Sequence, residues 1–369
     1  MTVRIRLLAA NLPYEEDIRV FTAVSKPVDT LKALYISIEN EGGFFGLAEI
    51  RSNIAFLTHI PDDEVPGVIR KLVEALDWTR PLRDLYTGLQ VSAAGHPSIA
   101  RAAIESALVD GLAREEGVTA AEFLGGAWQD SVETSNCLFY SPDDVFDRLA
   151  ARYVREGFTD LKVRIAIEDD FEHDLARLRR LRERYGGSIR LAVDANGAWP
   201  LDIAAKRLNA LAPFGLAYVE QPTTIGDWEA FARAGKGTDI PLMADENLKT
   251  DGDFEALARL GPPFLAHLKI VKMGGPRVVV EAARRLRESG VEAMMGQMNE
   301  GALATALAIH CAMAIRPKHH ELYGCYGLLD DPASGVRYHS GRVSIPKRPG
   351  IGLDFDAAQT TPLWEIKRR

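Results

Sequence analysis

The chain has 369 residues, of which 47% are apolar and 26% charged, so it has the composition of an ordinary globular protein with a sizeable core. Its net charge of −8 and the lack of long lysine and arginine runs argue against an extended nucleic-acid-binding surface. Three cysteines without CxxC spacing argue against a disulfide framework or a zinc knuckle, and they predict a reducing, cytoplasmic environment. The longest apolar stretch, residues 302–315, is interrupted by Thr305 and His310 and is too short to span a bilayer, so no membrane partner is expected.

The first third of the chain places strands before helices. Residues 2–10 and 30–50 are rich in β-forming side chains, and an Asn-Glu-Gly-Gly turn breaks the second segment. Residues 61–76 are expected to be helical, and residues 96–116 form a stronger helix with one apolar stripe and a stop at Gly117. This order is typical of an α+β domain, which we assign to residues 1–125.

From about residue 132 the pattern changes to short apolar strands that alternate with charged helices. Seven consecutive strand–helix units follow one another, and a weaker eighth strand is expected near residues 319–324. This alternation predicts a parallel sheet, and eight units predict a closed barrel, here residues 126–345. The remaining residues, 346–369, are expected to return to the N-terminal domain.

Charged and polar residues stand where these strands end, which is the face of a βα barrel that carries the chemistry. The carboxylates Asp194, Glu220 and Asp245 are 26 and 25 residues apart, and Lys269 follows 24 residues later. Each step is about one βα unit, so we expect the four side chains at one height on the rim. A single such residue equally fits a turn or a helix cap, but four in register favour a shared site. The other residues at strand ends are Lys162 and Arg164, which are expected to be catalytic together with Lys269, and Asn196, Glu246 and Glu300.

Three carboxylates on one rim repel one another unless a cation offsets their charge. A ligand set made only of oxygen favours a hard cation, Mg²⁺ before Mn²⁺ or Ca²⁺, with room left for water or substrate. A lysine beside such a cation has a lowered pKa and accepts a proton at neutral pH. The pattern therefore predicts removal of the proton α to a substrate carboxylate through an enediolate, with Lys269 as the base. Asn196, Glu246 and Glu300 are expected to support the site.

Six motifs occur in a fixed order: LKVR at 161–164, DAN at 194–196, VEQP at 219–222, ADEN at 244–247, LKIVKMGG at 268–275 and MMGQMNEG at 294–301. Together they resemble the enolase superfamily, in its muconate-lactonizing and dipeptide-epimerase branch. The resemblance implies an α/β fold, a modified (β/α)7β TIM-type barrel with an N-terminal α+β capping domain. It also implies one Mg²⁺ per chain held by Asp194, Glu220 and Asp245, a small-molecule carboxylate substrate, and a homo-oligomer.

One position departs from that branch, which usually has Lys-x-Lys at the end of the second strand. Here the motif is Lys162-Val163-Arg164, and arginine is a poor proton acceptor because it stays protonated. Arg164 is expected to bind the substrate carboxylate or stabilise the enediolate, or else to be a salt-bridge partner inside the barrel. One-base chemistry with Lys269 favours a lyase (β-elimination, such as dehydration) or a cycloisomerase. The alternatives are a racemase or epimerase of an amino-acid derivative or dipeptide, and a catalytically lapsed binding or scaffold protein.

Substrate specificity is less well determined by the sequence. Dipeptide epimerases typically carry Asp-x-Asp at the eighth strand, and this chain has no such motif there, although Glu321 is expected near the rim. Loops 12–27 and 50–61 of the capping domain are expected to cover the site. Their candidate substrate-binding residues are Arg19, Arg51 and Asn53, each of which also fits plain loop packing.

Overall fold

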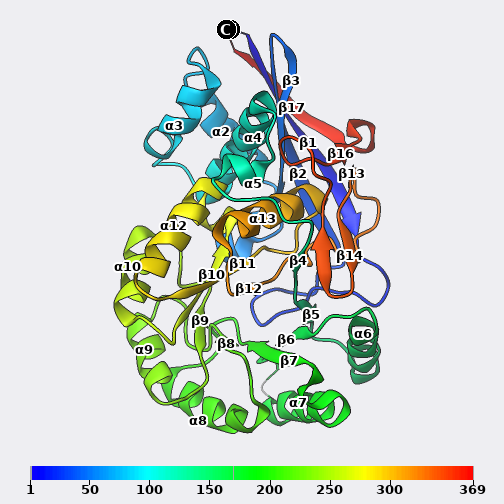
Figure 1. Cartoon of the computed structure of the whole chain (residues 1–369), viewed down its shortest axis with the longest axis vertical. Coiled ribbons are helices and arrows are strands. Elements are labelled where there is room, and N and C mark those ends of the chain that lie inside the picture. The colour runs from blue at the N-terminus through cyan, green and yellow to red at the C-terminus, as the bar shows by residue number, and fades with distance from the viewer. Residues whose placement is uncertain (1, 169, 369) are drawn as a thin grey trace.

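The structure, a computed structural model, describes residues 2–168 and 170–368. An antiparallel sheet in the order β17-β1-β2-β3 forms one end of the molecule (Figure 1), built from β1 (Val3–Pro13), β2 (Thr30–Asn40), β3 (Gly43–Arg51) and β17 (Thr361–Arg368). Strand β17 pairs with β1 from Val3 opposite Arg368 to Ala9 opposite Thr361. The C-terminal segment therefore completes the sheet that the N-terminal segment begins.

Helices cover one face of this sheet: α2 (Val65–Ala75), α3 (Leu82–Ser92) and α4 (Ser98–Glu116), with the short α1 (Ala55–Thr58) and α5 (Ala120–Phe123) beside them. The sequence predicted a helix with a single apolar stripe at α4. In the structure α4 is buried on all sides, because it packs against β3 on one side and against barrel helices on the other. Contact with β3 is direct: a side chain at Gly46 would place its Cβ only 2.1 Å from the carbonyl oxygen of Ala107.

Glu105 of α4 lies at this junction between the capping domain and the barrel. Its carboxylate accepts hydrogen bonds from the backbone N–H of Arg277 at 2.8 Å and from Nε2 of Gln90 at 2.5 Å. Burial raises the pKa of Glu105 to about 7 from its usual value near 4.5, although the N–H of Arg277 opposes the rise.

This raised pKa predicts a pH-dependent stability. A carboxyl group with a higher pKa in the folded state stabilises the fold below pH 4.5, and this stabilisation is lost as the pH rises through 7. The loss amounts to roughly 3 kcal/mol, at 1.4 kcal/mol per pKa unit. Glu105→Gln is expected to remove this loss of stability. Measured by urea unfolding, the free energy of unfolding of the variant should therefore rise relative to that of the parent between pH 4.5 and 8. An identical pH dependence in the two proteins would contradict the assignment.

The second domain is an eight-stranded parallel sheet in the order β5 to β12, curled into a barrel. The backbone N–H of Ser135 donates to the carbonyl oxygen of His320 at 3.0 Å, which joins the two outermost strands. The predicted seven strand–helix units and the short eighth strand are confirmed. The strands are β5 (Asn136–Leu138), β6 (Asp160–Arg164), β7 (Arg190–Asp194), β8 (Val219–Glu220), β9 (Leu242–Ala244), β10 (Leu265–Lys269), β11 (Glu292–Gly296) and β12 (His319–His320).

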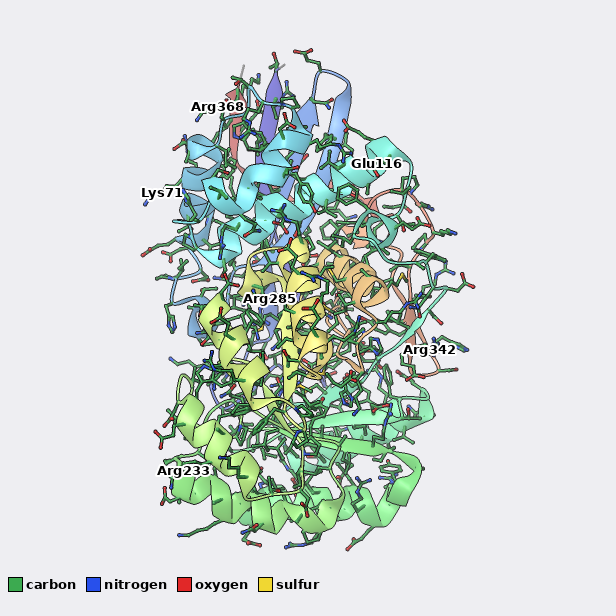
Figure 2. The ribbon with its side chains drawn as sticks, turned by 60° about the vertical axis from the view of Figure 1, so that its left-hand side comes forward. Lys71, Glu116, Arg233, Arg285, Arg342 and Arg368 are labelled. Atoms are coloured by element: carbon green, nitrogen blue, oxygen red, sulfur yellow. The ribbon has the colours of Figure 1, made fainter. Side chains whose placement is uncertain are left out.

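Helices surround the barrel on the outside (Figure 1). Their outer faces carry exposed charged side chains such as Arg233 and Arg285 (Figure 2). Among the described residues, no helix has the length and apolar character needed to cross a membrane. The outer helices are α6 (Asp143–Arg155), α7 (Phe171–Tyr185), α8 (Leu201–Leu211), α9 (Trp228–Lys236), α10 (Asp251–Leu260), α12 (Pro276–Glu288) and α13 (Ala302–Ile315), with α11 (Ile270–Met273) as a short turn after β10.

Short strands connect the barrel to the returning C-terminal segment. A three-stranded sheet contains β14 (Arg337–His339), β15 (Arg342–Ser344) and β4 (Val132–Glu133), and a two-stranded sheet contains β13 (Ala333–Ser334) and β16 (Asp354–Phe355). Of these strands, β13 and β16 lie beside the capping-domain sheet (Figure 1).

Candidate active site

The parallel register of the barrel brings the strand-end residues together. Arg164, Asp194 and Glu220 are Cα partners on the adjacent strands β6, β7 and β8. Glu220 is opposite Met243 on β9, and Asp245 stands two residues beyond. All of these polar side chains are buried. The buried apolar residues of each strand hold it at one height in the barrel. The charged residues at the strand ends, which are regularly spaced in the sequence, therefore form one row at the carboxyl ends.

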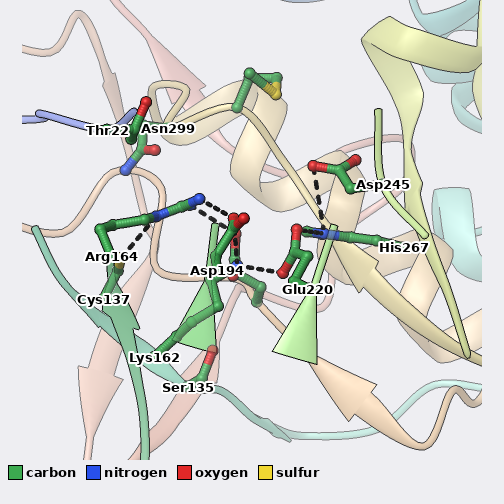
Figure 3. Close-up of polar contacts among 12 residues, drawn as sticks. Thr22, Ser135, Cys137, Lys162, Arg164, Asp194, Glu220, Asp245, His267 and Asn299 are labelled. Atoms are coloured by element: carbon green, nitrogen blue, oxygen red, sulfur yellow. Dashed lines mark hydrogen bonds and ion pairs between the residues drawn. The ribbon is translucent and has the colours of Figure 1, made fainter. Parts of the chain in front are cut away.

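Four cationic side chains are interleaved with the carboxylates. Figure 3 shows two of them, Lys162 and Arg164, beside Asp194 and Glu220. Nζ of Lys162 lies 2.8 Å from Oε2 of Glu220 and 3.9 Å from Oδ2 of Asp194. The guanidinium of Arg164 donates to Asp194 and to Sγ of Cys137. Nζ atoms of Lys269 and Lys272 lie 2.5 and 2.7 Å from the two oxygens of Asp245.

Electrostatics of this row differ from one carboxylate to the next. Burial and the nearby charge of Glu220 raise the pKa of Asp194 well above its usual range, against the opposing effect of Arg164. Burial also acts on Glu220, but Lys162 and His267 outweigh it and hold the pKa of Glu220 well below its usual range. The surroundings of the two carboxylates therefore differ: they favour the charged form of Glu220 and disfavour that of Asp194.

The carboxylate oxygens of this row fit a hard divalent cation. One oxygen of Glu220 and one of Asp245 lie within 4.8 Å of each other and of a ring nitrogen of His267, and Asp194 is next to Glu220 in the strand register without belonging to this cluster. Oδ1 of Asn196 and Oε2 of Glu246 are buried beside them without a hydrogen-bond partner. Unpartnered oxygens are costly to bury, and a cation with its bound water would satisfy them.

His267 was not among the residues that the sequence singled out. Its Nδ1 lies 2.7 Å from Oε1 of Glu220, while Nε2 has no partner and faces the backbone at Gly296. Burial and the charge of Lys269 lower the pKa of His267, so the ring is neutral. A proton on Nε2 would be a buried donor without an acceptor, which favours the proton on Nδ1, where it is donated to Glu220. His267 thus orients Glu220 and is unsuited to bind a cation through Nδ1.

A signal for His267 and Lys272 was present in the sequence. His267 is two residues before Lys269 on the same strand and therefore points to the same side of the sheet. Lys272 lies one helical turn after Lys269, and its Nζ also donates to the carbonyl oxygens of Asp245 and His267, at 2.7 and 2.8 Å.

Amide side chains hold the carboxylates in place. Asn196 donates its Nδ2 to Glu246 at 3.0 Å, and its backbone N–H donates to Asp194 at 2.8 Å. Oε1 of Gln221 accepts the backbone N–H groups of Asp245 and Asn247 at 3.1 and 3.2 Å. These bonds fix the loops after β7, β8 and β9 relative to one another.

A small cavity lies between this row and the capping domain. Strands β6 and β10 are four strands apart in a barrel of eight, so Arg164 and Lys269 face each other across it. Both charged and apolar side chains line it. Its lining consists of Val20, Thr22, Ser25, Arg51 and Phe56 from the capping domain and Arg164, Asn196, Asp245, Glu246, Lys269, Gln297, Met298 and Asn299 from the barrel.

Three other candidate residues, Lys162, Glu321 and Arg19, do not line this cavity. Lys162 and Glu321 contact each other below the cavity, and Lys162 borders a different cavity at the amino-terminal end of the strands. Arg19 lies outside the cavity, in a surface groove, where it pairs with Asp29.

Two more candidates contact neighbouring protein groups. Asn53 accepts a hydrogen bond from Nε of Arg51 at 2.9 Å. Glu300 accepts the backbone N–H of Met298 at 3.2 Å. The cavity-lining side chains that sequence reasoning missed, Thr22, Ser25, Gln297 and Asn299, are ordinary polar residues in loops and have no distinctive pattern.

Comparison with known proteins places the chain in a family. Residues 145–359 match the model of the family described as enolase C-terminal domain-like. The L-Ala-D/L-Glu epimerase of Bacillus subtilis (strain 168) is 26% identical over 340 residues, 90% of this chain and 92% of that protein. Muconate cycloisomerase 1 of Pseudomonas putida is 29% identical over 263 residues, 70% of each protein.

A solved structure agrees with these matches. The dipeptide epimerase from Methylococcus capsulatus, complexed with Mg and the dipeptide L-Arg-D-Lys, superposes with a TM-score of 0.85 at 27% identity, covering 96% of this chain and 100% of that one. The resemblance inferred from the motifs, and the barrel with its capping domain, are confirmed. The chain belongs to the enolase C-terminal domain-like family, in the branch of the enolase superfamily that contains muconate cycloisomerases and dipeptide epimerases.

Proposed function

We propose that this protein removes the proton α to the carboxylate of a small substrate in a Mg²⁺-dependent reaction, with β-elimination or cycloisomerisation as the net result. The observation that carries the proposal is the pair of groups that face each other across the cavity, a lysine amine at Lys269 and an arginine guanidinium at Arg164. Of the two, only the amine becomes a base when a bound cation lowers its pKa, because without a cation the charges of Asp245 and Glu220 outweigh burial and raise the pKa of Lys269. One face of the substrate carbon then meets a base and the other does not.

The cation would be held by Asp194, Glu220 and Asp245. When bound, it would supply positive charge to the substrate carboxylate and so make the neighbouring C–H group more acidic. Support comes from the unpartnered oxygens of Asn196 and Glu246 and from the Mg-containing relative.

The chain's own residues divide the remaining tasks. Nζ of Lys269 takes the α-proton, because it is the amine among the described cavity-lining groups. The guanidinium of Arg164 lies across the cavity, where its fixed charge stabilises the negative charge that develops on the substrate carboxylate. Lys162, buried between Glu220 and Glu321, stabilises the carboxylate row from below.

A second candidate is a racemase or epimerase of an amino-acid derivative or dipeptide. The comparisons favour it, because two of the similar proteins are dipeptide epimerases. Such a reaction needs proton delivery to the second face, where this chain has Arg164.

Proton transfer in D₂O tests the two candidates. The protein is incubated with Mg²⁺ and with panels of acid sugars, N-acyl amino acids and dipeptides, and the products are followed by NMR. We expect loss of water or ring formation from one panel. Recovered substrate with deuterium and inverted configuration would support the epimerase instead, and a complete lack of α-proton chemistry in all panels would contradict the proposal.

Arg164→Lys is expected to change the outcome at the second face. Lysine has a pKa several units below that of arginine, so the variant should deliver and accept a proton there. With a substrate found in the D₂O screen, we expect inversion at the α-carbon to increase by about 10²-fold over the parent. An inversion rate that is high in the parent and falls in the variant would show that Arg164 already serves as the second acid.

The same proposal includes one Mg²⁺ per chain, a small-molecule carboxylate as the ligand, a homo-oligomer and a cytoplasmic location. It includes neither a nucleic acid nor a membrane as a partner. Support for these points comes from the family resemblance, the acidic net charge and the unpaired cysteines.

A further inference from the structure

Two residues of β3 contact the barrel although they belong to the capping domain. Glu49 and Arg51 are two positions apart on the strand, so their side chains leave the same face of the sheet. Both are almost fully buried, with 3% and 1% of their surface exposed. They contact consecutive parts of one barrel segment, residues 298–304, which links β11 to α13.

Arg51 binds the carbonyl groups of this segment. Its Nη1 donates to the carbonyl oxygens of Met298 and Asn299 at 2.5 and 3.4 Å. Nε and Nη2 donate to the side chain and the carbonyl oxygen of Asn53. Because every nitrogen of the guanidinium already donates to protein, Arg51 is poorly placed to bind substrate, although it borders the cavity.

Glu49 binds the N–H groups that follow. Its two oxygens accept from Gly301 at 2.5 Å, from Leu303 at 3.1 Å and from Ala304 at 3.2 Å. These N–H groups lie at the N-terminus of α13, where the helix itself offers them no acceptor and the N-cap residue, Gly301, has no side chain to accept them. Two carboxylates thus cap this barrel helix: Glu49 from the capping domain, and Asp331 from the barrel domain, which accepts the N–H of Ala302 at 2.7 Å.

The part of this segment that Arg51 contacts borders the cavity, together with Gln297 before it. Gln297, Met298 and Asn299 are among its lining residues, and Asn299 has a left-handed φ of 55°. A residue other than glycine in this region needs outside support to stay there. Gly301 is equally constrained: a Cβ at this position would lie 2.5 Å from Oε1 of Glu49.

We propose that Glu49 and Arg51 are positioning residues that hold the loop 297–300 in the cavity from the capping domain. Docking of the capping domain thus completes the cavity wall on the side of β11. The inference rests on the proposed function only where it calls this cavity the active site.

The first test measures the loop directly. In Arg51→Met, which removes all the donors but keeps most of the side-chain volume, amide hydrogen exchange in peptides covering 298–304 is expected to accelerate at least tenfold. Glu39→Gln is the matched control, because Glu39 lies on β2 of the same sheet and pairs with Arg4 and Arg6 inside the capping domain. Unchanged exchange in 298–304 in the Arg51 variant would overturn the proposal.

Two further variants separate positioning from general destabilisation. Arg51→Lys keeps one donor and is expected to restore part of the protection. Gly301→Ala disturbs Glu49 from the barrel side and should give the same local signature. Acceleration spread evenly over the whole chain in every variant would show a structural role alone and overturn the proposal.

Enzyme kinetics distinguish a positioning role of Arg51 from a direct contact with the substrate. With a substrate from the D₂O screen, Arg51→Met is expected to lower kcat at least tenfold with less than a threefold change in KM. A rise in KM alone, with normal exchange in 298–304, would assign Arg51 to substrate binding. If no panel compound reacts, the proposed function fails, while the exchange experiment still decides the positioning role.

Discussion

Replacing Lys269 with alanine is expected to lower the rate of α-proton removal by about 10³- to 10⁴-fold, which is the range typical for loss of a general base. The reason is geometric: Nζ of Lys269 is the amine that borders the cavity opposite Arg164. Affinity for Mg²⁺ is expected to stay the same or to increase up to about threefold, because the ammonium of Lys269 competes for Asp245 in the parent. The measurements are single-turnover kinetics in D₂O and titration calorimetry with Mg²⁺.

Lys206→Ala is the control for this experiment, because Lys206 is an exposed lysine on the outer helix α8. It should match the parent in both measurements. A Lys269→Ala variant that keeps more than a tenth of the parent activity would remove Lys269 from its role as the base. A large loss of Mg²⁺ affinity in that variant would show instead that the substitution disrupts the carboxylate row.

Asp194→Asn is expected to weaken Mg²⁺ binding by on the order of 100-fold, because it removes one charge from the ligand set while keeping the side-chain shape. Asp194 lies next to Glu220 in the strand register, where burial and the charge of Glu220 raise its pKa, and a nearby cation favours the charged form of a carboxylate. Titration calorimetry with Mg²⁺ at pH 7.5 gives the affinity without requiring a substrate.

His267→Gln distinguishes this ligand set from the alternative cluster of Glu220, Asp245 and His267. Because His267 orients Glu220 through Nδ1, its replacement is expected to weaken Mg²⁺ binding by only about tenfold. If His267→Gln abolished Mg²⁺ binding while Asp194→Asn bound Mg²⁺ nearly as the parent does, His267 would be the ligand in place of Asp194. Equal, small effects in both would leave no support for a cation at this row.

The sequence alone determined the architecture of the barrel and the row of charges. Short buried strands alternate with charged helices, and this alternation specifies a parallel sheet in which all carboxyl ends lie on one side. Asp194, Glu220, Asp245 and Lys269 recur at intervals of one βα unit. This spacing is a local property of the chain, so it can be recognised in the sequence without knowledge of long-range contacts.

Tertiary structure decided which partner each charged group has. The sequence left Arg51 as a candidate for substrate binding, whereas the fold joins it to Met298, 247 positions along the chain. The fold likewise places Arg164 opposite Lys269, because the relative position of these two residues depends on closure of the barrel. Helix α4 is buried on all sides only because the capping sheet and the barrel both pack against it. A hydrogen bond or an ion pair depends on atoms brought within about 3 Å by the whole fold, and no local pattern encodes that distance.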